Sequence, residues 1–441
     1  MADILPPASI ASPTPALRRE LGKWDLTAIG VNQVIGSAVF ALPGTLAASI
    51  GGWSPWLVAG VAFASLLIAL CFAEVSSRFE GTGGSYLYTR AAFGRFAAFE
   101  VGWMMWFTRA ASWASVINVL VAGAGFYLPG IASGAPRAAL ITSIIAIVAG
   151  INILGIRLSS VVLNAFTIGK LLPLAVFIGV GMFFMDPARL QPGGDFTLAD
   201  LSTSALLLIF AFGGYEVIPV PAGEAKDPRT AVPFALIMTI VIVAAVTILV
   251  QVVALGTHPA LETSLKTPLA DAAGIFIGPA GAALLTLGVL ISTSGNNLGQ
   301  ALSGSRNLFA LAEQRDLPAW FGYVHPRFRT PVAAIAVTAG VALVLGLSGT
   351  FATLAAASAI SRLLVYVATC ASLMRLRSPA FAGVLRPATF TVPFGPLIPT
   401  AAILISMSIL AGASRLQLMA GLGALGAGAA LYALAVPGRR D

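Results

Sequence analysis

Long apolar stretches recur along this sequence and constrain its fold more than any other feature. Residues 57–72, for example, contain only apolar or small side chains. A membrane-spanning helix needs about 20 such residues in a row, whereas a β-barrel strand alternates polar and apolar residues. Only 10% of the residues are charged, compared with about 25% in soluble proteins. We therefore predict an all-α polytopic membrane protein and exclude the soluble and disordered classes.

Charged and turn-forming residues divide the apolar sequence into twelve expected membrane-spanning helices. Short polar tails, residues 1–23 and 437–441, precede and follow them. The expected spans are residues 24–50, 54–78, 98–129, 138–155, 159–185, 202–222, 231–256, 278–304, 331–348, 351–374, 394–413 and 416–436.

The distribution of positive charge predicts the orientation of these spans. If the N-terminus is cytoplasmic, 18 of the 25 lysines and arginines fall in segments inside the cell, four fall outside, and three lie within spans. Positive residues accumulate on the cytoplasmic side of membrane proteins. Both termini are therefore expected in the cytoplasm. The net charge of +8 is explained by this bias next to anionic lipid, and it does not indicate a nucleic-acid partner.

Two of the expected spans contain helix-breaking residues near their middle. The first has Gly36, Ser37 and Ala38, and the sixth has the segment 210–216, which contains two glycines. Unpaired backbone groups are costly in hydrocarbon, so protein, water or a ligand must satisfy them. The free amides of a half-helix suit a carboxylate. Two interruptions five spans apart predict an inverted 5+5 repeat with a substrate site near the midplane; close helix packing at glycine is the alternative.

Six ionisable residues lie within the expected spans, where a charge at a helix centre costs about 2.5–3.5 kcal/mol. Each should therefore face the bundle interior, water or a partner. For Glu74 and Glu100, close to the cytoplasmic boundary, a gate pair with Arg78 or Arg95 and plain snorkelling both remain open. The other four are Arg109, Lys170, Glu216 and Arg362.

The deeper charges favour function. A buried lysine such as Lys170 could exchange a proton during a transport cycle or occupy the space of a sodium ion. Arg109 keeps its proton, so it is either a counter-charge to Glu216 or a ligand for a substrate anion. Arg362 could face the interior or snorkel towards the interface.

Several motifs in order along the chain are similar to signatures of amino acid permeases. They are residues 36–40 with Pro43, 73–78 with 83–88, 212–216 with 223–228, 305–318, and Thr330 with Pro331. Over nearly its whole length the chain resembles bacterial members of the amino acid–polyamine–organocation (APC) superfamily, which includes the arginine/agmatine antiporter and the L-type amino acid transporters. The resemblance implies a LeuT-type fold with discontinuous helices 1 and 6. Its inverted repeats would be residues 24–185 and 202–377, and residues 394–436 would lie outside them.

The resemblance also implies a substrate site. Amides of the first interruption would hold the substrate carboxylate, carbonyls of both interruptions would hold the amino group, and spans 3 and 8 would line the side-chain pocket. Lys170 and Glu216 would take part in coupling. Glu74 is assigned to gating from its position near the cytoplasmic boundary, and not from the resemblance. The implied substrate-binding residues are Val34, Gly36, Ser37, Ala38, Thr108, Arg109, Trp113, Phe210, Gly213, Glu216, Asn296 and Gln300.

Together these features predict a sodium-independent secondary active transporter in a bacterial cytoplasmic (inner) membrane, working by proton-coupled symport or by exchange. Arg109 would repel a cationic substrate, so a neutral or acidic amino acid is expected. The alternative is a carrier for cationic amino acids or polyamines with Glu216 as the cation ligand. A channel or an intramembrane enzyme lacks support, because there is no polar pore lining and no nucleophile or metal cluster. No cofactor or metal is expected. The small-residue segment 421–428 fits either a homodimer contact or packing on span 11.

Overall fold

The computed structural model describes residues 17–131, 133–193, 195–348, 351–412 and 415–435, and in these residues the backbone is helical almost throughout. The one β-type pairing among them is an isolated bridge between Leu21 and Ala225. The predicted all-α class is therefore confirmed. The helices are α1 (Lys23–Val34), α2 (Ala38–Ile50), α3 (Ser54–Ser76), α4 (Ser85–Phe93), α5 (Arg95–Tyr127), α6 (Gly134–Leu154), α7 (Ile156–Gly181), α8 (Leu198–Phe212), α9 (Pro228–Thr257), α10 (Pro268–Phe276), α11 (Pro279–Glu313), α12 (Val332–Ser348), α13 (Phe351–Leu376), α14 (Leu397–Ala411) and α15 (Arg415–Ala435).

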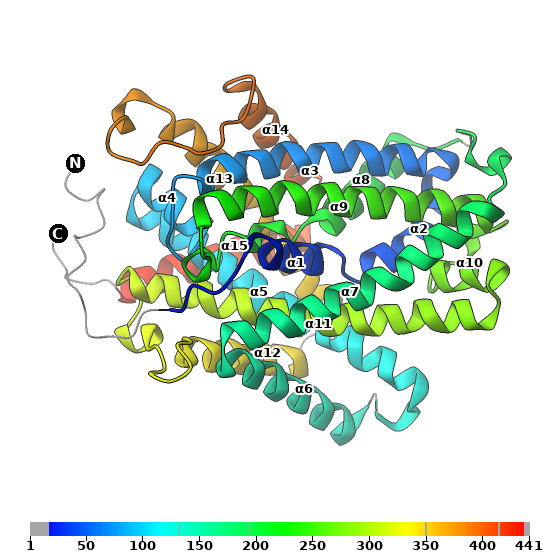
Figure 1. Ribbon diagram of the computed structural model, residues 1–441, viewed down its shortest axis with the longest axis horizontal. Helices are drawn as coiled ribbons and strands as arrows, with labels where there is room; N and C mark the ends of the chain where they lie inside the picture. The colour runs from blue at the N-terminus through cyan, green and yellow to red at the C-terminus, as the bar shows by residue number, and fades with distance from the viewer. Residues whose placement is uncertain (1–16, 132, 194, 349–350, 413–414, 436–441) are drawn as a thin grey trace.

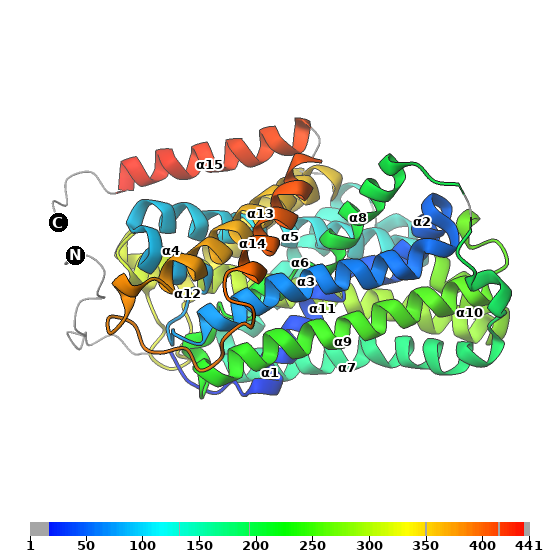
Figure 2. The same ribbon diagram turned by 90° about the horizontal axis from the view of Figure 1, so that it is seen from above.

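The longest helices run along the long axis of the molecule. Figure 1 shows α3, α7, α9 and α11 extended in this direction, and α3 packs against α9 while α7 packs against α11. The short helix α4 lies at one end of the bundle, and α2 and α10 lie at the other. Figure 2 shows α15 along one side, where it contacts α5 and α13.

Several helices have the length and composition needed to cross a membrane. Among the described residues, four helical stretches meet both criteria, and four shorter helices are similarly apolar. The four long stretches are Ala38–Ser76, which joins α2 to α3, Gly134–Leu154, Ile156–Phe184 and Pro228–Thr257. The helices therefore support an integral membrane protein.

Helix α7 has one exposed apolar face and one buried face that carries a polar side chain. Val161, Ile168 and Leu172 lie on one face and are 59%, 68% and 61% exposed, as expected for side chains that contact lipid. Lys170 lies on the opposite face and is completely buried. The costly polar group thus faces the protein, in agreement with the energetics of charges in hydrocarbon.

The sixth expected span differs from the structure in its second half. It was expected to continue to residue 222, but α8 ends at Phe212 and is followed by two 3₁₀ turns, Tyr215–Val217 and Ala222–Glu224. Pro219 and Pro221 lie in this segment. Proline lacks the amide hydrogen of an α-helical turn and clashes with the preceding turn, so the chain cannot resume an α-helix there.

Candidate functional site

The interruption between α1 and α2 is stabilised by side chains from α7 and α11. The amino group of Lys170 donates to the carbonyl oxygens of Asn32 at 2.9 Å and Ile35 at 2.7 Å. On α11, the Ser292 hydroxyl also donates to Ile35 O at 3.0 Å, and the Asn296 amide donates to Gln33 O at 3.1 Å.

The remaining carbonyl of this helix end belongs to Val34, and it accepts the amide of Gly36 at 2.8 Å. Each carbonyl from residue 32 to 35 therefore has a donor. The last carbonyls of a helix have no partner within the helix, and in a membrane they need one from elsewhere. Lys170 and its neighbours on α11 are the reason that α1 can end inside the bundle.

Helix α2 begins on the other side of this interruption. Its N-cap residue Ser37 makes no side-chain cap hydrogen bond, and the first amides of a helix have no acceptor within it. Ala38 also lines a small pocket between α2, α8 and α9. The N-terminal end of α2 therefore lies beside the end of α8.

The second interruption, after α8, lies directly against the first. Gly214 has a φ of +131°, and a Cβ at this position would lie 2.9 Å from Gln33 O. Glycine is required here for both reasons, because other residues rarely adopt this φ and the backbone of α1 leaves no space. The two helix-breaking segments predicted from the sequence thus meet in the folded chain.

We expect the substitution Gly214→Ala to destabilise the fold by about 1–3 kcal/mol and to reduce any transport activity strongly. The methyl group must displace the α1 backbone, which cannot rotate away as a side chain can. The measurement is the unfolding midpoint of the purified protein in detergent. Gly60→Ala on α3 is the matched control, since nothing lies within 4 Å of its Cβ position. A Gly214→Ala protein as stable as wild type would contradict the close contact.

Glu216 lies immediately after the second interruption and is the centre of a buried ionic cluster. Its Oε1 contacts Arg109 Nη2 at 2.7 Å and Arg362 Nε at 3.0 Å. Its Oε2 accepts hydrogen bonds from the Tyr366 hydroxyl and the Gly214 amide, each at 2.8 Å. The carboxylate thus joins α5, α13 and the interruption.

Part of this cluster is predictable from the sequence. The contact between Arg109 and Glu216 is one of the two roles that the sequence predicts for Arg109. The sequence does not decide the position of Arg362, and it gives no prediction for Tyr366. Arg362 and Tyr366 are four residues apart, so they share one face of α13. A polar pair at this spacing in an apolar helix is a signal that could have located the face.

The other expected substrate-binding residues of spans 3 and 8 lie on α5 and α11. Thr108 and Arg109 line a small pocket together with Glu216 and Arg362. Trp113 lies on the same helix and is completely buried. On α11, the Gln300 amide donates to Asn296 Oδ1 at 3.1 Å.

Two expected positions lie around the end of α8. Phe210 is in its last turn; its side chain lies outside the described residues. A Cβ on Gly213 would lie 2.4 Å from Arg362 Nη1. The guanidinium of Arg362 therefore packs directly against the backbone of the interruption.

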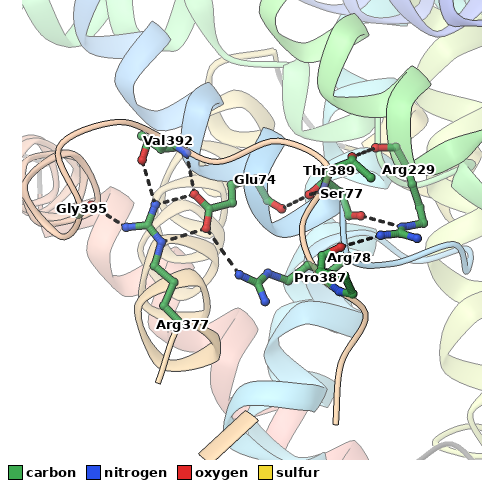
Figure 3. Close-up of polar contacts among 9 residues, drawn as sticks. All are labelled: Glu74, Ser77, Arg78, Arg229, Arg377, Pro387, Thr389, Val392 and Gly395. Atoms are coloured by element: carbon green, nitrogen blue, oxygen red, sulfur yellow. Dashed lines mark hydrogen bonds and ion pairs between the residues drawn. The ribbon is translucent and has the colours of Figure 1, made fainter. Parts of the chain in front are cut away.

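Glu74, expected to act in gating, is held at the end of α3 near α4 (Figure 3). Arg377 contacts both of its oxygens, Nε at 2.8 Å from Oε1, and the Val392 amide donates to Oε2 at 2.7 Å. Hydrogen bonding to Glu74 raises the pKa of Arg377 above its ordinary value. Arg78 Nη2 lies 3.6 Å from Glu74 Oε1, so one of the two expected partners does pair with Glu74. The other expected partner, Arg95, pairs with Asp316 instead.

Arg95 is instead bound elsewhere. It contacts Asp316 at 2.6 Å, beside Arg90 at 2.8 Å from the same carboxylate. Arg95 begins α5 and Asp316 follows α11, so this contact links those two helices at the α4 end of the bundle. A charge pattern along the sequence does not reveal which helix ends become neighbours, and this explains the incorrect pairing.

Figure 3 also shows that the segment between α13 and α14 is attached to α3 and α9. Arg229 of α9 donates to Ser77 O at 3.0 Å and to Pro387 O at 2.5 Å. The Thr389 amide donates to the Ser77 hydroxyl at 3.2 Å, and its own hydroxyl donates to Arg229 O at 2.7 Å. These bonds and the Glu74–Arg377 pair connect the ends of four helices.

Comparison with known proteins places these features in a family. The family model described as amino acid permease matches residues 21–439. The methylthioribose transporter of Bacillus subtilis (strain 168) is 29% identical over 416 residues, covering 89% of this chain and 87% of that protein. The serine/threonine exchanger of the same organism is 28% identical over 404 residues, covering 89% and 91%. Its branched-chain amino acid permease is 26% identical over 418 residues, covering 90% and 88%.

Proposed function

Because this chain belongs to the amino acid permease family, we propose that it is a secondary active transporter that carries an amino acid across the bacterial cytoplasmic membrane by alternating access. The family membership expected from the sequence motifs is confirmed. The observation that carries the proposal is the meeting of the two helix interruptions, where Gly214 packs against Gln33. Half-helix ends that converge in this way are typical of transporter binding sites.

The proposed substrate orientation follows from the polarity of these ends. The α-carboxylate would bind the amides of Ser37 and Ala38, with Gly36 allowing the chain to turn. The α-amino group would bind the carbonyls of Val34 and Gly213, and that of Phe210. The substrate side chain would extend towards Thr108, Arg109, Trp113, Asn296 and Gln300.

We further propose a LeuT-type arrangement with residues 24–185 and 202–377 as inverted repeats and both termini in the cytoplasm. The two interruptions occupy corresponding places in these two segments, which supports the repeat. The Glu74–Arg377 pair would then close the cytoplasmic end, since it ties α3 to the segment after α13. Opening towards the cytoplasm would require this pair to separate.

Coupling is proposed to be independent of sodium. The amino group of Lys170 occupies the space between the carbonyls of Asn32 and Ile35, and carbonyl oxygens are also the ligands that a sodium ion would use. The ammonium group of Lys170 would take the place of a sodium ion. The proposed coupling is therefore symport with protons or exchange of amino acids.

A carrier for cationic substrates is not favoured by the contacts of Glu216. The Glu216 carboxylate accepts hydrogen bonds from Arg109, Tyr366 and the Gly214 amide, and Arg362 Nε lies 3.0 Å from the same Oε1 that Arg109 contacts. The carboxylate is therefore already neutralised by guanidinium groups of the protein. A substrate ammonium would also approach two guanidinium groups.

Uptake into proteoliposomes tests the proposal. Purified protein is expected to give saturable uptake of at least one radiolabelled amino acid without sodium, stimulated either by an inward proton gradient or by unlabelled amino acid inside. Liposomes without protein provide the background. Absence of uptake for every amino acid under both driving forces would overturn the proposal, and a strict sodium requirement would overturn the role of Lys170.

A further inference from the structure

The Arg109–Glu216–Arg362 cluster contains one more positive than negative charge. All three side chains are buried, with 2%, 4% and 8% exposure. Two guanidinium groups share a single carboxylate, and both contact the same oxygen, Oε1. An uncompensated charge in a membrane-embedded interior is unfavourable. The cluster therefore lacks an anion.

Other acidic residues of the described interior do not supply this anion, because they have partners of their own. Glu74 pairs with Arg377, Glu224 with Arg306, and Asp316 with Arg90 and Arg95. The remaining buried carboxylate oxygens belong to Glu100, which lies beside Gly428 of α15. Glu100 precedes Arg109 by nine residues on the same helix, about 14 Å along its axis. It is too distant to neutralise the cluster.

The cluster also contains polar atoms whose hydrogen-bonding capacity is unused. Within the described residues, Arg109 Nη1 and the Thr108 hydroxyl are buried and have no hydrogen-bond partner. Both residues line the small pocket that Glu216 and Arg362 also line. Buried donors without partners are costly, and a site occupied only during transport explains their presence. Both groups can donate to an anion.

The pocket adjoins the second helix interruption. Arg362 packs against Gly213 in the second interruption, so its guanidinium lies where the proposed amino-group site ends. Apolar side chains complete the wall and would suit methylene groups. They are Met105, Val217, Val220 and Val365.

We propose that this pocket, lined by Arg109, Thr108 and Arg362, is a subsite for a carboxylate on the substrate side chain, and that the transported molecule is an acidic amino acid. The inference rests on the proposed transport function and narrows its substrate class. A carboxylate would balance the charge of the cluster, and it would accept hydrogen bonds from Arg109 Nη1 and Thr108. An amide of the same shape would accept hydrogen bonds but leave the charge unbalanced.

The test compares acids with their amides in proteoliposomes. Competition against a transported label is measured for aspartate, asparagine, glutamate and glutamine. In wild type we expect at least one acid to compete about tenfold or more better than its amide, the effect of one charged hydrogen bond. In Arg109→Gln the ratio should fall to about one, with amide binding retained. Arg189→Gln, an exposed arginine outside the cluster, is the matched control and should keep the wild-type ratio.

Thr108→Val provides a second test that leaves every charge in place, in case the Arg109→Gln protein does not fold. It removes a hydrogen bond that the acid and the amide would both accept, so it should weaken the binding of both and keep the preference for the acid. Unchanged binding of both would show that Thr108 does not line the subsite. Transport of neutral amino acids without any preference for acids would overturn the subsite but not the proposed function. If Arg109→Gln weakens the binding of acids and amides equally, the subsite is also overturned, because Arg109 would then bind the α-carboxylate. No transport of any amino acid would overturn the proposed function itself.

Discussion

Replacing Glu216 with glutamine is expected to destabilise the protein by about 3–5 kcal/mol, the usual cost of removing one partner from a buried ion pair. The substitution keeps the shape of the side chain but removes the only carboxylate between Arg109 and Arg362 in the described cluster. Two buried guanidinium groups then face each other without compensation. The unfolding midpoint of the purified protein in detergent should fall by several degrees.

A second substitution separates charge from shape in this prediction. The double variant Glu216→Gln/Arg109→Gln carries one positive charge in the cluster, as wild type does, and should recover part of the lost stability. Glu262→Gln is the control, because Glu262 is exposed in the segment before α10. A Glu216→Gln protein that unfolds at the wild-type midpoint, or a double variant less stable than the single one, would show that the cluster is not organised by charge.

Substituting Lys170 with methionine is expected to reduce transport at least about tenfold. Each hydrogen bond from a charged donor is worth about 1.5–3 kcal/mol, and Lys170 donates to the carbonyls of Asn32 and Ile35. Methionine has similar length but leaves these carbonyls short of a donor, so the interruption between α1 and α2 loses its shape. The measurement is the initial rate of uptake in proteoliposomes as a function of pH.

The expected pattern for Lys170→Met differs from that for Glu216→Gln. Methionine also removes the cost of burying an amino group, so global unfolding should change less than transport does. Any remaining uptake should lose its dependence on pH, if Lys170 takes part in coupling. Lys266→Met, at an exposed position outside the bundle, should behave as wild type. Unchanged rate and pH dependence in Lys170→Met would remove this residue from the mechanism.

The helical class was predictable because the driving force is local. An apolar run of sufficient length forms a helix in lipid whatever its neighbours are, so most helices lie close to their expected ranges. The exceptions have specific causes. The sixth span ends at Phe212 because Gly213 and Gly214 interrupt it, and Pro219 and Pro221 prevent an α-helix from resuming. The eighth extends to Glu313 rather than residue 304. Arg306 interrupted the apolar pattern there, but it is completely buried against Glu224, so the helix continues.

The candidate site was predictable only in part. Lys170, Arg109 and Glu216 were recognisable because an ionisable group within an apolar helix must have a compensating partner. Tyr366 gave no such signal, since a tyrosine is common in membrane helices. For Arg362, in the expected span 351–374, the sequence did not decide between a position facing the interior and snorkelling. Its contact with Glu216 depends on how α13 packs on α5.

The sequence by itself determined the positions of the apolar runs, of the glycines and prolines that interrupt two of them, and of the few charged residues within them. These are properties of single segments. In hydrocarbon a charge or an unpaired backbone group is unfavourable wherever its segment lies. Only the tertiary structure decided the pairings, such as Lys170 on the end of α1, two arginines on Glu216, and Arg377 rather than Arg95 on Glu74. Pairing requires contact within a few ångströms, and helix packing alone sets such distances between segments far apart in the chain.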